Sequence, residues 1–401
     1  MNSGWRTRNL GDLCDVIGGG TPSKNNPDFY SGMIPWATVR DMRQEVITDT
    51  ECHITEEAVK SSATNIIPAG NVVIATRVGL GKVCLLDQDT AINQDLRGII
   101  PKDKKTVAVQ FLFWWLKAMS DVIIAEGTGA TVQGVKLPFI KALQIPVLPL
   151  EEQRRIIAIL NESFAGLAAA KANAEKNLQN ARAIFERQLG YIFIRGGKKT
   201  EVTTLETVLA VQPQNGWSPP AANHSESGTP VLTLSAVTGF VFKPDKRKFT
   251  SAPTDSRRNY WVKNGDLLIT RSNTPELVGH VAIASGITEP TIYPDIIMRM
   301  NPLPNRIMTE FLYYQMRAPT LRNEIIGRAH GANPTMKKIS NGAVKTLPIT
   351  VPPITTQRAI VDALNSLATE TQRLELIYQR KLAALDALKK SILHNAFAGE
   401  L

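Results

Sequence analysis

The sequence contains only three cysteines, Cys14, Cys52 and Cys84, among 401 residues. All three lie in the first quarter of the chain and form neither a CxxC metal motif nor a disulfide framework. The amino-terminal segment lacks the apolar stretch of a signal peptide. No apolar run approaches the roughly 18 residues that a membrane-spanning helix needs. We therefore expect a cytoplasmic protein, kept in a reducing compartment, that does not enter a membrane.

The sequence also lacks recognisable catalytic motifs. Gly18–Gly20 and Val78–Lys82 are rich in glycine, but neither segment completes G-x-x-x-x-G-K-S/T or G-x-G-x-x-G. The five histidines are scattered without metal-ligand spacing, and no G-x-S-x-G motif is present. The Asn/Asp-Pro-Pro-aromatic motif of amino-methyltransferases and a loop for S-adenosylmethionine are also absent. We therefore expect no catalytic residue, cofactor or metal in this chain.

The chain has an excess of positive charge. Its formal net charge is +10 and its isoelectric point is about 9.5. Such an excess suits a polyanionic partner such as nucleic acid, although charge alone does not separate this from an ordinary basic protein. Hydrophobic residues make up 43% of the sequence, which is enough for packed cores in two domains of ordinary size.

The most informative feature is an internal repeat. Its clearest copies keep a constant offset, 357 − 153 = 204 residues: Pro149, Gln153, Arg154, Leu160 and Asn161 recur as Pro353, Gln357, Arg358, Leu364 and Asn365. Weaker matches keep the same order along the chain, and they pair Pro35 and Thr38 with Pro230 and Thr233, Ile67–Arg77 with Trp261–Arg271, Asp95 with Asp295, Phe111–Leu112 with Phe311–Leu312, and Gly127 and Thr131 with Gly331 and Thr335. A period near 200 residues indicates two copies of a domain.

Each repeat ends in a long amphipathic helix with one apolar seam, because apolar residues recur at alternating spacings of three and four. The first seam is Ile157, Leu160, Phe164, Leu167, Lys171, Ala174, Leu178, Ala181 and Phe185; the second is Ile360, Leu364, Leu367, Thr371, Leu374, Tyr378, Lys381, Leu385, Leu388 and Ile392. Neither seam is suited to exposure, so we expect each helix to cover the other. The chain order then requires the second helix to run back along the first, as an antiparallel pair.

These patterns predict an α+β fold with two similar globular domains at opposite ends of the helix pair, related by a pseudo-two-fold axis. The predicted boundaries are 1–148 and 196–350 for the globular domains, with the long helices in 149–195 and 351–401. Short strands are expected at Ile34–Val39, Asn71–Thr76, Pro230–Leu234 and Asp266–Thr270. Amphipathic helices are expected at Val107–Met119 and Met308–Arg317, a basic turn at Phe242–Phe249, and a hinge at Gly196–Lys199.

Polar loops carrying basic residues recur in both globular domains. Arginine and lysine can bind phosphates or guanine edges, and asparagine can read adenine, whereas a solvated surface charge is the simpler reading of any one residue. The candidate DNA-binding residues are Thr38, Arg40, Arg77, Lys82, Arg97, Thr128, Thr131 and Lys136 in the first domain, and Lys246, Arg247, Lys248, Arg257, Arg258, Arg271, Asn273, Arg328, Asn333, Thr335, Lys337 and Lys338 in the second.

The long helices open with PLEEQR and PPITTQR, the chain closes with LAALDALKKSILHNAFAGEL, and two divergent globular domains each precede a long helix. In these features the whole chain resembles the specificity subunit of type I restriction-modification systems. The resemblance implies that the globular domains are target recognition domains, each reading half of a split, asymmetric site on double-stranded DNA. It also implies that the helices act as a spacer and dock two methyltransferase subunits, and that restriction subunits join the complex. Adenine methylation and DNA cleavage would then belong to those partners.

Three other readings remain open from the sequence. The same architecture could serve a DNA-binding scaffold without methylation, or a protein–protein adaptor whose charge is incidental. A stand-alone enzyme is the third, which the missing motifs disfavour. The target bases and the gap between half-sites do not follow from the sequence.

Overall fold

The computed structural model describes residues 5–128, 134–194, 200–333 and 335–400. The chain divides into two units, the first comprising Met1–Glu175 with Arg380–Leu401 and the second Lys176–Gln379. Each unit contains one β-rich globular domain and one part of each of two 45-residue helices, α6 (Leu150–Ile194) and α10 (Ile354–Ala398). The predicted hinge at 196–199 lies outside the described residues.

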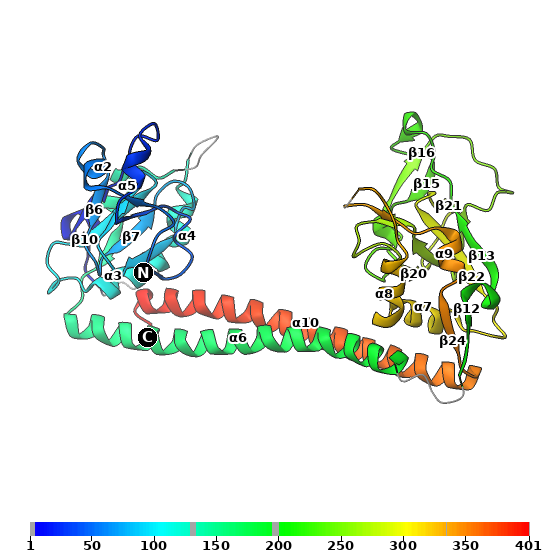
Figure 1. Cartoon of the computed structure of the whole chain (residues 1–401). Helices are drawn as coiled ribbons and strands as arrows, with labels where there is room; N and C mark the ends of the chain where they lie inside the picture. Colours follow the sequence, from blue (N-terminus) through cyan, green and yellow to red (C-terminus); the bar gives the residue numbers. More distant parts are fainter. Residues whose placement is uncertain (1–4, 129–133, 195–199, 334, 401) are drawn as a thin grey trace. The chain divides into compact units, whose positions relative to one another are not determined.

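The globular domain of the first unit is built on two sheets (Figure 1). A five-stranded sheet has the order β2-β10-β7-β8-β4, a four-stranded sheet has the order β5-β3-β9-β6, and β1 pairs with β11 near the start of α6. The strands are β1 (Thr7–Asn9), β2 (Cys14–Gly18), β3 (Ile34–Ala37), β4 (Val46–Ile47), β5 (His53–Ile54), β6 (Asn65–Ile67), β7 (Val72–Ala75), β8 (Val83–Leu86), β9 (Thr90–Ile92), β10 (Leu96–Pro101) and β11 (Gln144–Pro146). The helices are α1 (Leu10–Leu13), α2 (Glu56–Lys60), α3 (Val109–Ala118), α4 (Ser120–Ala125) and α5 (Leu137–Ala142).

The second unit repeats this plan. Its sheets have the orders β13-β22-β18-β20 and β14-β16-β15-β21-β17, with the pairs β12–β24 and β19–β23 beside them. The strands are β12 (Glu201–Thr204), β13 (Leu209–Asn215), β14 (His224–Ser225), β15 (Thr229–Leu232), β16 (Arg247–Thr250), β17 (Trp261–Val262), β18 (Leu267–Thr270), β19 (Ser272–Asn273), β20 (Val281–Ile283), β21 (Thr291–Ile292), β22 (Ile297–Pro302), β23 (Lys337–Lys338) and β24 (Pro348–Val351). The helices are α7 (Thr309–Arg317), α8 (Pro319–Gly327) and α9 (Asn341–Lys345).

The two sheet orders confirm the predicted repeat and the α+β class. β2-β10-β7-β8 corresponds to β13-β22-β18-β20, and β3-β9-β6 corresponds to β15-β21-β17. In both units one short parallel contact joins corresponding strands, β3 with β9 and β15 with β21. The four predicted strands and the two predicted amphipathic helices, α3 and α7, are present with ends shifted by one or two residues.

Backbone register corrects two of the sequence matches by one residue. The carbonyl of Thr76 accepts from the amide of Val135 at 2.9 Å, and the carbonyl of Arg271 accepts from the amide of Ile339 at 2.9 Å. Arg271 therefore stands at the position of Thr76, not of Arg77. Likewise Leu96 pairs with Ala75 whereas Ile297 pairs with Thr270, so the partner of Asp295 in the repeat is residue 94. The sequence alignment paired residues of the same type, whereas the backbone hydrogen bonds pair residues at equivalent positions of the strands.

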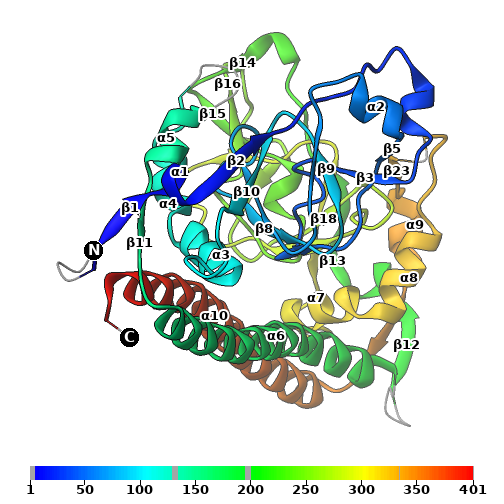
Figure 2. The ribbon, with the colours of Figure 1, turned by 90° about the vertical axis from the view of Figure 1, so that its left-hand side faces the viewer.

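The long helices pack on each other and on their own domains within each unit (Figures 1 and 2). In the first unit Lys171 pairs with Asp386 at 2.8 Å, and Lys389 lies 5.0 Å from the ring centre of Phe164. The residue numbers rise along one helix as they fall along the other, so the segments run antiparallel. In the second unit Arg182 of α6 pairs with Glu375 of α10 at 3.1 Å. The two helices run antiparallel there as well, and Leu364 of α10 lies in the core that they share with the globular domain.

The first predicted seam is confirmed, because all nine of its residues are buried or half-buried. The second holds as far as Tyr378, after which Lys381 and Leu388 are exposed and Leu382 and Lys389 are half-buried in their place. A straight helix turns every 3.6 residues, so a stripe spaced at 3.5 drifts off the contact face unless one spacing lengthens.

One glutamine fastens each long helix to its domain. Oε1 of Gln153 accepts from the amide of Ala108 at 2.9 Å, and its Nε2 donates to the carbonyls of Thr106 and Leu148 at 2.9 Å. Gln357 repeats this arrangement with the amide of Met308 and the carbonyls of Arg306 and Pro352, at 2.8 to 2.9 Å. Both glutamines are fully buried. This pattern, which we call the glutamine clasp, explains why glutamine recurs at the start of both helices.

A second repeated contact lies two turns further along each helix. Asn161 Oδ1 accepts from the indole nitrogen of Trp114 at 3.1 Å, and Asn365 Oδ1 accepts from the hydroxyl of Tyr314.

Among the helices of the described residues, none is both long and apolar enough to cross a bilayer.

Candidate nucleic-acid interface

The candidate residues of the first unit gather in loops at one end of its two sheets. β3 and β9 run parallel and end there, β7 ends there, and β8 and β10, antiparallel to β7, begin there. Residues 93–95 pass from one sheet to the other at this end. The hydrogen bond from the Val135 amide to the Thr76 carbonyl brings residues 134–136 to the same place. The fold therefore assembles loops that are about a hundred residues apart in sequence.

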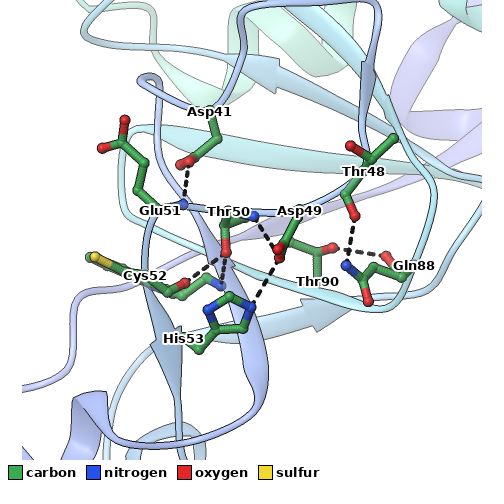
Figure 3. Close-up of polar contacts among 10 residues, drawn as sticks. Asp41, Thr48, Asp49, Thr50, Glu51, Cys52, His53, Gln88 and Thr90 are labelled. Atoms are coloured by element: carbon green, nitrogen blue, oxygen red, sulfur yellow. Dashed lines mark hydrogen bonds and ion pairs between the residues drawn. The ribbon is translucent and has the colours of Figure 1, made fainter.

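The loop after β3 is held by one carboxylate. Asp41 Oδ2 accepts from the amide and the hydroxyl of Thr38 at 2.7 and 2.9 Å, and Oδ1 accepts from the amide of Glu51 at 2.8 Å. Figure 3 shows Asp41 reaching Glu51 across this loop, with Thr50 bridging to the backbone of Cys52. The Thr38 side chain is thus occupied by the loop itself, whereas Arg40 is exposed to solvent.

Arg77 and Arg97 lie beside the same loop end. Arg77 forms an ion pair with Asp95 at 3.6 Å, and its side chain is 48% exposed. Arg97 is half-buried and donates to the carbonyls of Gln94 and Leu96 at 2.9 and 2.7 Å. Burial and the nearby charge of Arg77 lower the pKa of the Arg97 guanidinium. Arg97 therefore supports the loop, whereas Arg77 keeps part of its guanidinium free for a ligand.

A cavity of about 740 Å³ opens at this end, with Thr38 and Arg40 in its lining together with Gln94 and Asp95. Asp41 and Glu51 also line it, so its cations and carboxylates are mixed.

The remaining first-domain candidates lie around the same end of the sheets or outside the described residues. Lys82 points its ammonium toward the carbonyl of Met42 at 3.5 Å and lines a different cavity, next to α10. Thr128 pairs through its backbone with Gly134, and Lys136 is exposed just before α5. Thr131 lies outside the described residues.

Most candidates of the second unit form one group at the corresponding end. Arg271 follows β18, Arg328 follows α8, and β19 pairs with β23, which sets Asn273 opposite Lys337. A cavity of about 630 Å³ brings Arg271, Arg328 and Lys338 together.

The loop before β23 is tied internally. The Thr335 hydroxyl donates to Asn333 Oδ1 at 2.8 Å, and the Lys337 ammonium donates to the carbonyl of Gly331 at 3.0 Å. Asn273 uses its side chain on the hydroxyl of Thr238 and on the following amide.

The other basic candidates of this unit lie just before, on and after β16. The predicted turn at 242–249 was too long, since Arg247–Thr250 is a strand that pairs with β15. Lys246 and Lys248 are exposed, while Arg247 is tied to Glu289 at 2.7 Å and stacks on Phe249. The last two candidates, Arg257 and Arg258, are exposed in the connection to β17, and Arg257 pairs with Asp255 at 3.2 Å.

Sequence reasoning missed several residues at these loop ends. Gln94 accepts from the Thr21 hydroxyl, and Asp295, at the same position of the repeat, accepts from the Ser218 hydroxyl. Lys24 and His330 line the two cavities. A repeat alignment with the corrected register would have placed Gln94 opposite Asp295. Within the described residues, no three His, Cys, Asp or Glu side chains are grouped as metal ligands would be.

Comparison with known proteins identifies a family. The model described as the type I restriction modification DNA specificity domain matches residues 2–178 and again 197–379. A specificity subunit of a type I restriction enzyme from Escherichia coli is 34% identical over 165 residues, which is 39% of this chain and 40% of that protein. The MjaVIII specificity subunit of Methanocaldococcus jannaschii is 22% identical over 99% of this chain and 93% of its own length. The first relatives are matched over about 40% of their length.

Solved structures show the same fold. A chain from a study of complex assembly and conformational transition of the type I R-M system matches with a TM-score of 0.77 at 19% identity, covering 100% of this chain and 99% of that one. The HsdS subunit of Thermoanaerobacter tengcongensis matches with a TM-score of 0.63 at 20% identity, covering 100% and 98%. Two β domains, each followed by a long helix, with the helices packed together, are thus common to these chains.

Proposed function

The chain belongs to the family of type I restriction-modification DNA specificity subunits, and from this premise we propose that it reads a split, asymmetric site on double-stranded DNA. The globular domains in 1–148 and 196–350 are the two target recognition domains, and each reads one half of the site. The observation that carries this proposal is the duplicated loop end, where one strand order presents different side chains in the two units. Different side chains favour different bases, so the half-sites differ.

The candidate residues divide by what they can offer DNA. Exposed cations, among them Arg40, Lys136, Lys246 and Lys248, suit phosphate contacts, which position a protein on the duplex. Arg77 can present a guanidinium fork to a guanine edge, and Asn333 can read adenine. The full set of candidates given above remains our proposal for the interface, Thr131 included.

Catalysis is assigned to partner subunits. We assign adenine methylation to two methyltransferase subunits that dock on α6 and α10, and cleavage to restriction subunits that join the same complex. The long helices also set the gap between the half-sites, because α6 continues from the first unit into the second. This chain then contributes recognition and assembly.

Mapping of methylated adenines tests the proposal. DNA would be sequenced from cells that express the chain together with its neighbouring methyltransferase, and from cells that express either one alone. We expect a split, asymmetric methylated motif only when both are present. A palindromic motif, or methylation that persists without this chain while the methyltransferase is active, would contradict the proposal.

A further inference from the structure

The second unit contains a basic cavity, lined by cationic side chains and by no described carboxylate. Arg271, Arg328 and Lys338 line it together with His330, and the described lining residues include no Asp or Glu. Arg328 is fixed in place, since it pairs with Glu324 at 3.2 Å and donates to the Thr346 hydroxyl at 3.0 Å.

Two of these cations keep donors available. Nε of Arg271 is buried with no hydrogen-bond acceptor among the described residues, and its Nη1 only approaches the carbonyl of Asp295 at 3.5 Å. Lys338 is exposed, and no described carboxylate forms an ion pair with it. A buried donor without an acceptor is costly, and an anionic oxygen with several lone pairs is the group that best satisfies a guanidinium.

The repeat makes a matched comparison possible, because each of the three positions has a counterpart in the first unit. Arg271 stands where Thr76 stands, as the backbone bonds to Ile339 and Val135 show. Arg328 and Glu126 both follow the last turn of their helix, α8 and α4, and donate their amides to the carbonyl four residues earlier.

Lys338 corresponds to Gly134, since each closes an antiparallel bridge, to His330 and to Thr128 respectively. The positions of these three cations are therefore occupied in the first unit by a buried threonine, an acidic residue and a glycine. The first unit instead has two other cations nearby, Lys136 at the position of Ser340 and Arg77 at the position of Ser272.

The charges of the two globular domains differ in the same direction. Residues 1–148 contain 15 Lys and Arg against 15 Asp and Glu, a net charge of zero. Residues 196–350 contain 18 Lys and Arg against 11 Asp and Glu, a net charge of +7. The charge excess of the chain is thus concentrated in the second domain.

We infer that the cavity of Arg271, Arg328 and Lys338 binds a phosphodiester group of the DNA backbone, so that the second recognition domain supplies most of the electrostatic hold on DNA. The inference rests on the proposed function. The first domain, with balanced charge and with Arg77 already paired to Asp95, then contributes mainly base contacts. The half-site of the second domain is thus bound mainly through its phosphates, and that of the first domain mainly through its bases.

Salt dependence of binding tests the inference. The full chain would be titrated with a mixed-sequence duplex from about 50 to about 200 mM salt, where each phosphate contact contributes about 0.9 to the slope of log affinity against log salt. Because the cavity holds one phosphodiester group, we expect the double variant Arg271→Gln with Lys338→Gln to flatten the slope by about 0.9, so that its affinity falls about threefold less over this range. The matched variant in the first domain, Arg77→Gln with Lys136→Gln, should flatten it by less than about half that amount.

A charge-preserving variant, Arg271→Lys with Lys338→Arg, controls for folding and should keep the slope of the unaltered chain. The inference is overturned if the first-domain pair flattens the slope as much as the second-domain pair, or if the charge-preserving variant loses as much as the glutamine variant. If the unaltered chain shows no salt-dependent binding, the proposed function itself fails, and this result is distinct from the other two.

Discussion

The carboxylate of Asp41 holds Thr38 by two hydrogen bonds, to the amide at 2.7 Å and to the hydroxyl at 2.9 Å. Its other oxygen accepts from the amide of Glu51, so one side chain fixes both ends of the segment that joins β3 to β5. We predict that Asp41→Ala makes the first half of the methylated motif degenerate and leaves the second half unchanged. Methylation mapping checks this, and loss of both halves would show that the substitution unfolds the chain instead.

Removal of either glutamine clasp should destabilise only its own unit. Gln357→Leu leaves the amide of Met308 and two carbonyls without partners inside the protein, which costs roughly 3 kcal/mol. Hydrogen exchange should then accelerate at Met308 and remain slow at Ala108. Gln372→Leu, on an exposed position of the same helix, is the control, and equal acceleration in both units would contradict the prediction.

Acid should weaken the second unit through His280. The imidazole is 7% exposed and stacks on Phe240. Burial, then the positive charges of Arg322 and Arg317, lower the pKa of His280 to about 4. The folded state therefore favours the neutral ring, and the stability it contributes is complete above pH 6.5 and is lost as the pH falls toward 4.

The full loss is about 3 kcal/mol. Urea unfolding of the second unit can be monitored by hydrogen exchange in β18 and β20. The free energy of unfolding should decrease as the pH is lowered from 6.5 to 4. His280→Gln should remove this decrease, and a variant that keeps it would assign the effect to other groups.

Thiol reagents should distinguish the three cysteines. Cys14 and Cys84 are 1% and 2% exposed, and burial raises the pKa of their thiols to about 12 and about 11. Cys52 is exposed. Because the thiolate is the reactive form, iodoacetamide at pH 8 should label Cys52 in the native chain, and the other two only after unfolding. In Cys52→Ser, rapid labelling under native conditions would show that the first domain opens locally.

Helix length should set the gap between the half-sites. Seven residues inserted between Glu175 and Lys176, with seven more between Gln379 and Arg380, would keep the two helices in register. At 1.5 Å per residue the insertion adds about 10 Å, or about three base pairs at 3.4 Å each. Methylation mapping should show the same two half-sites with a longer gap. An unchanged gap would exclude the helices as its determinant.

The sequence predicts the parts of this chain that repeat and misses those that differ between the copies. The first helix seam and the recurrence of Gln153 as Gln357 follow from periodicity and spacing, because burial on a helix imposes both. The position of Arg271 does not follow in this way. Identical letters align it with Arg77, whereas strand pairing aligns it with Thr76. A one-residue slip exchanges the faces of a strand, and only hydrogen-bond register resolves it. The cavity of the second unit depends on that register, so it could not be predicted from the sequence.

Within the described residues, the hydrogen bonds of the glutamine clasp all go to main-chain atoms. Thr106 and Ala108 present the same carbonyl and amide as Arg306 and Met308, although their side chains share nothing. A helix that grips a domain by its backbone places no demand on the domain's side chains at that point. The recognition surface can therefore accumulate substitutions, or be exchanged whole for another domain of the same fold, while the joint to the helix stays intact.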